Sequence, residues 1–407
     1  MTGHAKKLTL LYVLFHFQHP DVPGSSRHYY LIRELAKKHD ITLLSFVKTK
    51  VPTHALQEMK KMTTALYLYK TPVTSESKLG IKAPLLFKIT KVLAKKHTLK
   101  EMKKSIHQLV ATGQYDALLF HGINIYPVIK QVRDIPIVAD VCDATAHLLR
   151  HQLAFTAPSD LMTIVYRYLN IRSYEKRLFK QSPYLAFITN RDGYRATGST
   201  DSFSVVPNGV DTLYWKRKSK PLAVPHLIFM GVMDYGPNED AILYFSRQVL
   251  PLIKKQIPNI RVTIVGKNPS KAITALDEKE HIHITGYVKD VRPYLEKAGI
   301  FIAPLRFAAG QQNKVLQAMS MELPVITFSP VREGLVVRKN ENPPLLLAKT
   351  AQDFAGKVFE VLDNEKQYKH LSVMGRRFVE KNFTWQSSAQ QWEAFIYKTL
   401  SSGHMRE

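Results

Sequence analysis

The stretch APLRFAAGQQNKVLQAMSMELPVITFS, residues 303–329, decides the fold. It continues a short apolar run at 300–305 and passes through a glycine-bearing turn at 307–311. Apolar residues then recur at helical spacing over 313–321, and a second apolar run follows at 324–328. The order strand, turn, helix, strand predicts one crossover unit of a parallel sheet.

The turn before this helix also suggests a binding site. In parallel sheets, ligands bind at the carboxyl ends of the strands, and the free N–H groups of a first helical turn favour an anion such as phosphate. Gly310 would let the backbone approach such an anion, and Lys314 would add a positive charge. The same pattern is also typical of an ordinary crossover with a solvated lysine.

The rest of the second half repeats this alternation. Strands are expected at 227–230, 261–265 and 281–284, and a glycine closes each of them, at Gly231, Gly266 and, after Thr285, Gly286. This repetition predicts that closely approaching backbone lines one edge of the sheet. Further helices are expected at 240–255, 291–296, 351–362 and 367–381, and a last helix starts near 385.

The first half opens as a doubly wound domain, with a strand at 8–15, a glycine turn, a helix at 27–38 and a strand at 41–47. Gly24 could bring backbone close to a ligand or could serve only the turn. Strands are also expected at 66–69, 115–121, 135–141, 185–189 and 204–206, and a basic helix at 161–180. The turn 207–211 has the composition of a hinge, and 407 residues predict two domains.

Polar residues follow two of these first-half strands. His121 ends the strand 115–121, so it is a candidate general base or acceptor-positioning group, or a histidine that bonds locally. Asp140 and Asp143 could orient a sugar hydroxyl or cap the next helix. The sequence shows no cluster of metal-ligand spacing, so we expect no metal site.

The net charge of +25 predicts a polyanionic partner, which could be nucleic acid, an anionic membrane or phosphorylated substrates. Between residues 82 and 104 eight lysines stand against one acid. A helix at Leu85–Ile106 could lie on an anionic membrane, with Leu86, Ile89, Leu93, Met102 and Ile106 toward it, or could pack this stripe on its own domain. Nucleic-acid-binding motifs are absent, which disfavours nucleic acid.

The single cysteine, Cys142, fits a reducing compartment. No apolar run reaches the roughly 18 residues that span a bilayer. Lys6 and Lys7 before the apolar run 8–15 faintly resemble a signal peptide, but a buried first strand fits better because no small-residue cleavage site follows. We therefore expect a cytoplasmic protein.

Several second-half stretches share their order and spacing with one family. They are VVPNGVD (205–211), FMGVMDYGPNEDAILYF (229–245), IVGKNPS (264–270), TGYVKDVRPYLEKAGIFIAPLR (285–306), GQQNKVLQAMSMELPVI (310–326), REGL (332–335) and NFTW (382–385). In these stretches the chain resembles the retaining GT-B glycosyltransferases of family 4 type, most of all the sugar transferases of bacterial exopolysaccharide clusters. The first half resembles them loosely, through 30–46 and 172–190.

This resemblance implies an α/β fold of GT-B type, in which two Rossmann-like, doubly wound parallel-sheet domains face each other across an interdomain cleft. The acceptor-side domain would span residues 1–205 and the nucleotide-sugar domain residues 206–380. The last helix, 381–407, would pack back on the first domain.

The resemblance also implies a reaction and its residues. A hexosyl group would pass from a UDP- or GDP-linked sugar to a lipid-linked or polysaccharide acceptor, without a metal or other cofactor. The basic helix 85–106 would hold such an enzyme on the inner face of the cytoplasmic membrane. The implied catalytic residues are His121 and Lys314. The implied nucleotide-sugar ligands are Gly24, Gly231, Asn238, Gly266, Lys267, Gly286, Tyr287, Gly310, Gln311, Gln312, Asn313, Gln317 and Glu333.

Three positions depart from the family pattern. Gln317 replaces a glutamate that would accept hydrogen bonds from ribose hydroxyls, Ala309 replaces an earlier glutamate, and Glu322 replaces a glycine. A glutamine keeps one acceptor oxygen but loses the charge, a difference of roughly 1–2 kcal/mol. These departures keep two alternatives open, namely a degenerate GT-B protein that binds a ligand or partner without turnover, and a glycosyltransferase associated with nucleic acid.

Overall fold

The structure, a computed structural model, describes residues 6–22, 24–47, 51–70, 85–153, 158–220, 222–277, 281–308, 310–335 and 342–403. Its contacts divide the chain into two units. The first comprises Met1–Phe187, Gly193–Val206 and Ser388–Glu407, and the second comprises Ile188–Asp192 and Pro207–Ser387. The sequence placed the corresponding boundaries at 205 and 380.

The first unit is built on a parallel sheet of seven strands in the order β3-β2-β1-β4-β5-β6-β7. The strands are β1 Thr9–Leu14, β2 Asp40–Val47, β3 Ala65–Lys70, β4 Ala117–His121, β5 Ile137–Cys142, β6 Tyr184–Phe187 and β7 Ser204–Val205. In the sheet, β2 and β3 lie on one side of β1, and β4 to β7 lie on the other side. This is the doubly wound topology that the opening of the sequence predicts.

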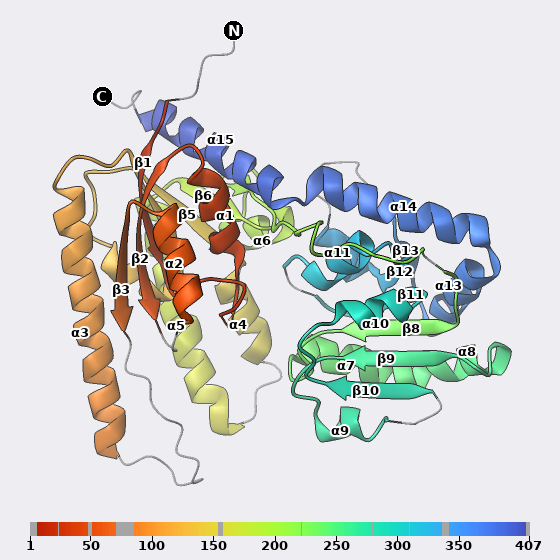
Figure 1. Ribbon diagram of the computed structural model, residues 1–407. Helices are drawn as coiled ribbons and strands as arrows, with labels where there is room; N and C mark the ends of the chain where they lie inside the picture. Colours follow the sequence, from red (N-terminus) through yellow and green to blue (C-terminus); the bar gives the residue numbers. More distant parts are fainter. Residues whose placement is uncertain are drawn as a thin grey trace. The chain divides into compact units, whose positions relative to one another are not determined.

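Helices cover both faces of this sheet (Figure 1). They are α1 Arg27–Leu35, α2 Thr53–Met62, α3 Leu85–Val110, the 3-10 helix η1 Ile123–Val128, α4 Thr145–Leu153, α5 Pro158–Gln181, α6 Asn190–Thr197, which the two units share, and α15 Trp385–Gly403. Leu11 and Val13 of β1 pack with α3 and α5 on one face. Leu10, Tyr12 and Leu14 pack with α1, α2 and α15 on the other, so the period-two alternation of β1 supplies two cores.

The second unit contains a parallel sheet of six strands in the order β10-β9-β8-β11-β12-β13. The strands are β8 His226–Met230, β9 Arg261–Val265, β10 Ile282–Gly286, β11 Ile300–Ala303, β12 Val325–Phe328 and β13 Leu346–Ala348. The helices are α7 Gly236–Tyr244, the π-helix η2 Phe245–Val249, α8 Leu250–Gln256, α9 Lys271–Thr274, α10 Arg292–Lys297, α11 Asn313–Ser320, α12 Ser329–Glu333, α13 Ala351–Asp363 and α14 Glu365–Asn382.

The decisive stretch forms the predicted crossover, because β11, α11 and β12 follow one another and the two strands pair in parallel. Val315, Leu316 and Met319 of α11 are fully buried against the same side of the sheet as Ile228 and Met230 of β8. The other side carries Leu227 and Phe229 of β8 under α7, α8 and α13. Both units therefore confirm the predicted α/β fold with two doubly wound sheets.

The structure corrects the membrane prediction for part of the helix Leu85–Ile106. The backbone of α3 is helical, but Met102 and Ile106 are fully buried in the core of the first unit, so these two residues cannot turn toward a membrane. The predicted contacts of Leu86, Ile89 and Leu93 lie outside the side chains that the structure describes. Among its described residues, no helix combines the length and hydropathy needed to cross a bilayer.

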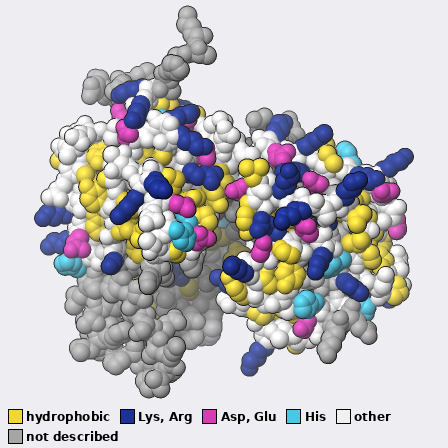
Figure 2. Space-filling view, viewed as in Figure 1, with side chains coloured by type: hydrophobic (Ala, Val, Ile, Leu, Met, Phe, Trp, Pro, Cys, Tyr) yellow, Lys and Arg dark blue, Asp and Glu magenta, His cyan; other side chains and the backbone are white. Residues whose placement is uncertain are grey.

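The positive charge is not concentrated in one patch on the face that Figure 2 shows. Lys and Arg side chains are spread over both units there, with Asp and Glu between them. Some of these cations form local ion pairs, such as Lys357 with Glu360 and Arg292 with Asp290. On this face the Lys and Arg side chains are therefore distributed over the surface and do not form one basic patch.

Candidate functional site

The second unit has a topological switch point between β8 and β11. These strands are neighbours in the sheet, yet the chain leaves β8 toward β9 on one side and β11 toward β12 on the other. In open α/β sheets, ligands bind outside the carboxyl ends of the strands at such a point. Gly231 directly follows β8, and α11 begins ten residues after β11 ends.

Lys314 projects from the first turn of α11 toward this point. Its Nζ atom donates a hydrogen bond to Oδ1 of Asn238, in the first turn of α7, and lies 4.4 Å from the ring centroid of the fully buried Phe229. Burial of the amine disfavours its charged form and lowers the pKa of Lys314 to about 7. An anion placed here would gain from the charged lysine and would stabilise it in return.

Gly231 and Gly266 lie on the loops after β8 and β9, and Gly286 is the last residue of β10 at the same edge of the sheet. The N–H of Gly231 donates to the carbonyl of Val265 (3.0 Å), and the N–H of Gly266 donates to the carbonyl of Gly286 (3.1 Å). A Cβ atom on Gly266, whose φ is +157°, would lie 1.7 Å from the carbonyl oxygen of Gly231. Gly266 is therefore required for its loop to approach the loop of Gly231, whatever ligand the two loops contact.

Gln311 and Asn313, which were predicted to bind a ligand, form hydrogen bonds within the protein itself. The amide of Gln311 accepts a hydrogen bond from the N–H of Asn208 and donates one to its carbonyl oxygen, both at 3.0 Å. Oδ1 of Asn313 accepts further bonds from the amides of Gln311 (3.3 Å) and Asn208 (3.4 Å). Gln311 is thus occupied in fixing the predicted hinge 207–211, a role that the sequence does not distinguish from ligand binding.

Arg191 connects two predicted site residues and was missed by the sequence analysis. Its guanidinium donates to the carbonyl oxygens of Gly310 (3.2 Å) and Pro330 (3.2 Å) and to the carboxylate of Glu333 (3.3 Å). The available signal was its position shortly after β6, where a strand of the parallel sheet ends.

Four further predicted ligands lie on these loops and helices. The side chains of Lys267 and Tyr287 are exposed on the loops after β9 and β10, while Gln317 is half-buried in the second turn of α11. Gln312 is the residue before the start of α11. Their predicted contacts with a nucleotide sugar stay predictions.

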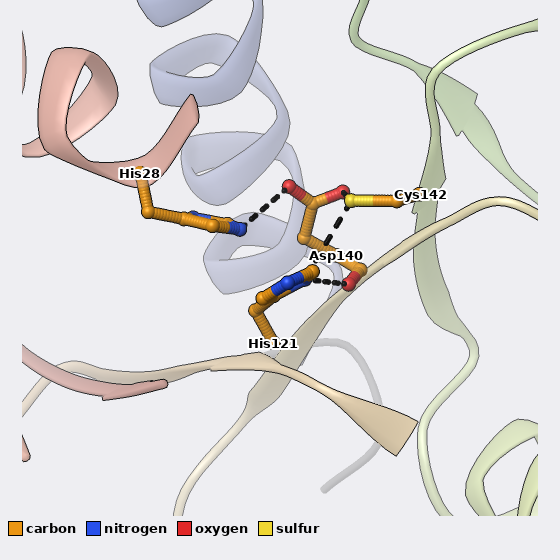
Figure 3. Close-up of side chains that lie close together, drawn as sticks. All are labelled: His28, His121, Asp140 and Cys142. Atoms are coloured by element: carbon orange, nitrogen blue, oxygen red, sulfur yellow. Dashed lines mark hydrogen bonds and ion pairs between the residues drawn. The ribbon is translucent and has the colours of Figure 1, made fainter. Parts of the chain in front are cut away.

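The first unit has its own switch point between β1 and β4, and His121 stands there at the end of β4. Figure 3 shows its ring beside that of His28, with the carboxylate of Asp140 and the thiol of Cys142 next to them. The two ring centroids are 4.2 Å apart. Gly24 (φ +127°) belongs to the loop before α1, and a Cβ atom there would lie 3.4 Å from Nε2 of His16.

Each member of this group has a defined bonding partner. Nδ1 of His121 donates to the backbone carbonyl of Asp140 (3.0 Å), since a carbonyl oxygen can only accept. The carboxylate of Asp140 accepts from Nε of Arg27 (2.7 Å) and lies 3.5 Å from Nε2 of His28. Nδ1 of His28 in turn shares a hydrogen bond with the hydroxyl of Tyr12 (2.7 Å). Asp140 therefore forms an ion pair with Arg27. This is neither of the two roles that the sequence suggested, which were to orient a sugar hydroxyl or to cap the next helix.

Burial sets the protonation states of these groups. It lowers the pKa of His28 well below its usual value, and it lowers the pKa of His121. Burial also raises the pKa of the Cys142 thiol well above its usual value. Both imidazoles are consequently neutral near pH 7, and His121, with Nδ1 protonated, keeps an electron pair on Nε2.

The four ligand atoms of His28, His121, Asp140 and Cys142 lie within 4.8 Å of one another, close enough for a metal ion. The chemistry of these four side chains nevertheless does not suit a metal ion. A cation would compete with Arg27 for Asp140, would take the proton-bearing Nδ1 of His121 and would need a deprotonated thiol. The group is better described as a hydrogen-bonded network that orients His121. The sequence did not reveal it because its members come from α1, β4 and β5.

The comparisons with known proteins agree with this fold. Residues 224–364 match the family described as glycosyl transferases group 1. An uncharacterized 44.6 kDa protein in the cps region of Klebsiella pneumoniae is 24% identical over 166 residues. That alignment covers 39% of this chain and 42% of the relative, so less than half of the relative's length is matched.

Solved structures match the chain over nearly its whole length. HepE of Anabaena in complex with UDP superposes with a TM-score of 0.65 at 12% identity, over 97% of this chain and 100% of that one. S. aureus TarM superposes with a TM-score of 0.66 at 11% identity, over 96% of this chain and 99% of that one. Residues 224–364 therefore resemble the glycosyl transferases group 1 family, and the chain as a whole has the GT-B fold.

Proposed function

We propose that this protein is a retaining glycosyltransferase that moves a hexosyl group from a UDP- or GDP-linked sugar to a lipid-linked or polysaccharide acceptor. The observation that carries the proposal is the convergence of Gly231, Asn238 and Lys314 at the switch point of a domain that resembles the group 1 family. HepE, which has the same fold, has been solved with UDP and with UDP-glucose. The cps region named for the Klebsiella relative supports a role in cell-surface polysaccharide synthesis.

The second unit would stabilise the leaving group. As the bond from the sugar to the diphosphate breaks, negative charge grows on the departing phosphate oxygen. The positive N-terminal end of the α11 dipole and the amine of Lys314 would neutralise this charge. Since these groups supply positive charge by themselves, we propose that the reaction does not require a metal ion.

The first unit would position a sugar hydroxyl. His121 is neutral, and its bond to the carbonyl of Asp140 fixes the ring so that Nε2 can accept a hydrogen bond. The ion pair between Arg27 and Asp140 holds that part of the backbone in place. His121 would thus orient the acceptor or the transferred sugar through Nε2.

We also propose that the enzyme works at the cytoplasmic face of an anionic membrane. The net charge of +25 and the lysines of α3 support this location. Lys100 and Lys104 are exposed, while Met102 and Ile106 on the same helix are buried. The attraction would therefore be electrostatic, without insertion of these apolar residues, and salt should weaken it.

The first test of the function is thermal stabilisation by UDP, GDP and ADP. A ligand at about 100 times its dissociation constant adds about 2.7 kcal/mol to the stability of the state that binds it. We expect one nucleotide to raise the melting temperature of the wild type and of Lys369→Met, which changes an exposed lysine paired with Glu365. Lys314→Met, which keeps the side-chain stem against Phe229, should lose the shift.

Product formation then separates the two main alternatives. An enzyme should release the nucleoside diphosphate from the matching nucleotide sugar when acceptor glycolipid is present. Nucleotide binding without any release would favour the degenerate binding protein. If none of the nucleotides stabilises the wild type, the donor site proposed at Lys314 is wrong.

A further inference from the structure

We propose that His19, Asp21 and His54 of the first unit form a binding site for a divalent transition-metal ion such as Zn²⁺. His19 and Asp21 lie in the loop between β1 and α1, and His54 lies in the first turn of α2. Their ligand atoms all lie within 4.8 Å of one another. None of the three belongs to the network of Figure 3, so the inference stands apart from the proposed glycosyl transfer.

The distances suit a small ion. Oδ2 of Asp21 lies 2.8 Å from Nε2 of His54 and 3.9 Å from Nδ1 of His19. Two ligands at 2.0–2.2 Å from a tetrahedral ion are roughly 3.4 Å apart, a value between these two distances. Because the side chains of Asp21 and His54 are exposed, small rotations can equalise the two distances around a bound ion.

His19 is held in the orientation that a ligand requires. Only 2% of the residue is exposed, and its Nδ1 accepts a hydrogen bond from the N–H of Asp21 (3.1 Å). Nδ1 therefore carries the electron pair, and the protonated Nε2 donates to the carboxylate of Glu58 (3.1 Å). The hydroxyl of Tyr29 donates to the same carboxylate oxygen (3.0 Å).

This arrangement is the one in which a carboxylate orients a metal-binding histidine. The outer carboxylate fixes the tautomer and raises the basicity of the opposite nitrogen. Glu58 takes that position, and Tyr29 holds Glu58. On binding, the ion would displace the N–H of Asp21 from Nδ1 of His19, and this exposed loop leaves that N–H free to bond water.

The donor types select the class of ion. Two imidazole nitrogens and one carboxylate suit Zn²⁺, Ni²⁺ or Cu²⁺, whereas Mg²⁺ and Ca²⁺ prefer sites built of oxygen. In the buried network, by contrast, Arg27 already occupies the carboxylate. Asp21 pairs with the two imidazoles, and Glu58 pairs with His19, so none of these groups carries a fixed positive charge that would repel a cation.

A bound ion would join the β1–α1 loop to α2. Residues 19–21 would be tied to His54, and this loop leads through Gly24 to Arg27 and His28 at the start of α1. The ion would therefore fix the segment that carries two members of the buried network.

The experiment uses full-length protein without a histidine tag, freed of metal by a chelator. Zn²⁺ binding is measured by titration calorimetry, and Co²⁺ is used as a spectroscopic substitute that absorbs visible light when its site is tetrahedral. We expect one equivalent of either metal in the wild type. Asp21→Asn and His54→Gln, both at exposed positions, should bind at least tenfold more weakly and lose the Co²⁺ absorption.

Two further variants sharpen the result. His97→Gln changes an exposed histidine that lies 3.6 Å from Glu101 on α3, and it should bind like the wild type. Glu58→Gln leaves all three ligands in place but removes the outer carboxylate, so it should bind 10- to 100-fold more weakly. If the wild type binds no equivalent, or if Asp21→Asn and His54→Gln bind as well as His97→Gln, the site does not exist.

Discussion

Lys314 combines a buried position with a charge-bearing group. Its amine is placed against the ring of Phe229 and the amide of Asn238, where few water molecules can solvate it. This burial lowers the pKa of the lysine to about 7, so the ligand-free protein holds a mixture of charged and neutral amine near neutral pH. A diphosphate would select the charged form.

We therefore expect nucleotide affinity to fall as the pH rises above 7. Binding to the charged amine requires a proton that the free protein progressively loses above a pKa of about 7, so affinity should drop up to tenfold per pH unit. Calorimetric titrations between about pH 7.5 and 9 measure this, because the nucleotide phosphate, with a pKa near 6, is already ionised there. Lys314→Met should show weak, pH-independent affinity. A wild-type affinity that does not change over this range would contradict the assigned role.

Single residues of the site could be predicted from the sequence where their role depends on their position relative to a nearby strand or helix. Gly231 and Gly266 were visible because each directly follows a strand, and Lys314 because it lies in the first turn of the helix after β11. Arg27 was not, because its partner Asp140 lies 113 residues away and only the packed sheet brings them together. The role of Gln311 could not be predicted either, since a glutamine that holds Asn208 looks in the sequence like one that holds a ligand.

Two residues after the end of α11 stands a residue that fits its backbone conformation poorly. Glu322 has a φ of +59°, and the N–H groups of Glu322 and Leu323 bond back to the carbonyls of Met319 and Ala318, both at 3.0 Å. This is the helix C-terminus that usually carries glycine. The family glycine replaced here thus belongs to the end of α11 opposite Lys314, and its loss concerns the helix more than the ligand.

We expect Glu322→Gly to stabilise the second unit by about 1 kcal/mol, because a left-handed residue with a Cβ atom costs roughly 1–2 kcal/mol and part of this gain is lost to chain entropy. Glu322→Ala is the matched control, since it also removes the weak ion pair with Arg376 (4.0 Å) but keeps the Cβ atom. Urea unfolding followed by hydrogen exchange in α11 measures both variants. An equal gain in Glu322→Ala would attribute the effect to the carboxylate and not to the backbone.

The limits of α11 were predicted closely because its apolar spacing is regular and Pro324 follows it. The helix expected at 240–255 was predicted as one element, but it consists of α7, the π-turn η2 and α8. An extra residue in one turn shifts the apolar face by only part of a turn, so hydrophobic spacing alone did not reveal η2.

At the scale of the whole molecule, the last helix completes the first unit. Trp392, Phe395 and Ile396 of α15 are buried with Leu10 and Tyr12 of β1, although nearly the whole chain separates them in sequence. Apart from Ile188–Asp192, the second unit lies between these two parts in the sequence, as the continuous stretch Pro207–Ser387. The sequence suggested this return through its resemblance to a family, because apolar spacing does not show which core a helix joins.

We expect Trp392→Ala to lower the free energy of unfolding of the first unit by about 3–5 kcal/mol, since it removes a fully buried indole from a packed core. Gln390→Ala, at an exposed position on the same helix, should leave stability unchanged. Hydrogen exchange in β1 and β2 reports on the first unit. Nucleotide-dependent protection of the second unit should persist in both variants, and its loss in Trp392→Ala would show that the units do not unfold independently.

This return of the chain has a consequence for biosynthesis. When the ribosome has completed β7, the first unit has all its strands but lacks the helix that covers Leu10 and Tyr12. The second unit must be synthesised before Trp392 is added, which at about 5–20 residues per second takes roughly 10–40 seconds. During that interval the uncovered apolar face is open to chaperones and to aggregation, while the second unit can already fold. A premature stop codon shortly before position 388 would therefore damage the domain encoded at the beginning of the gene.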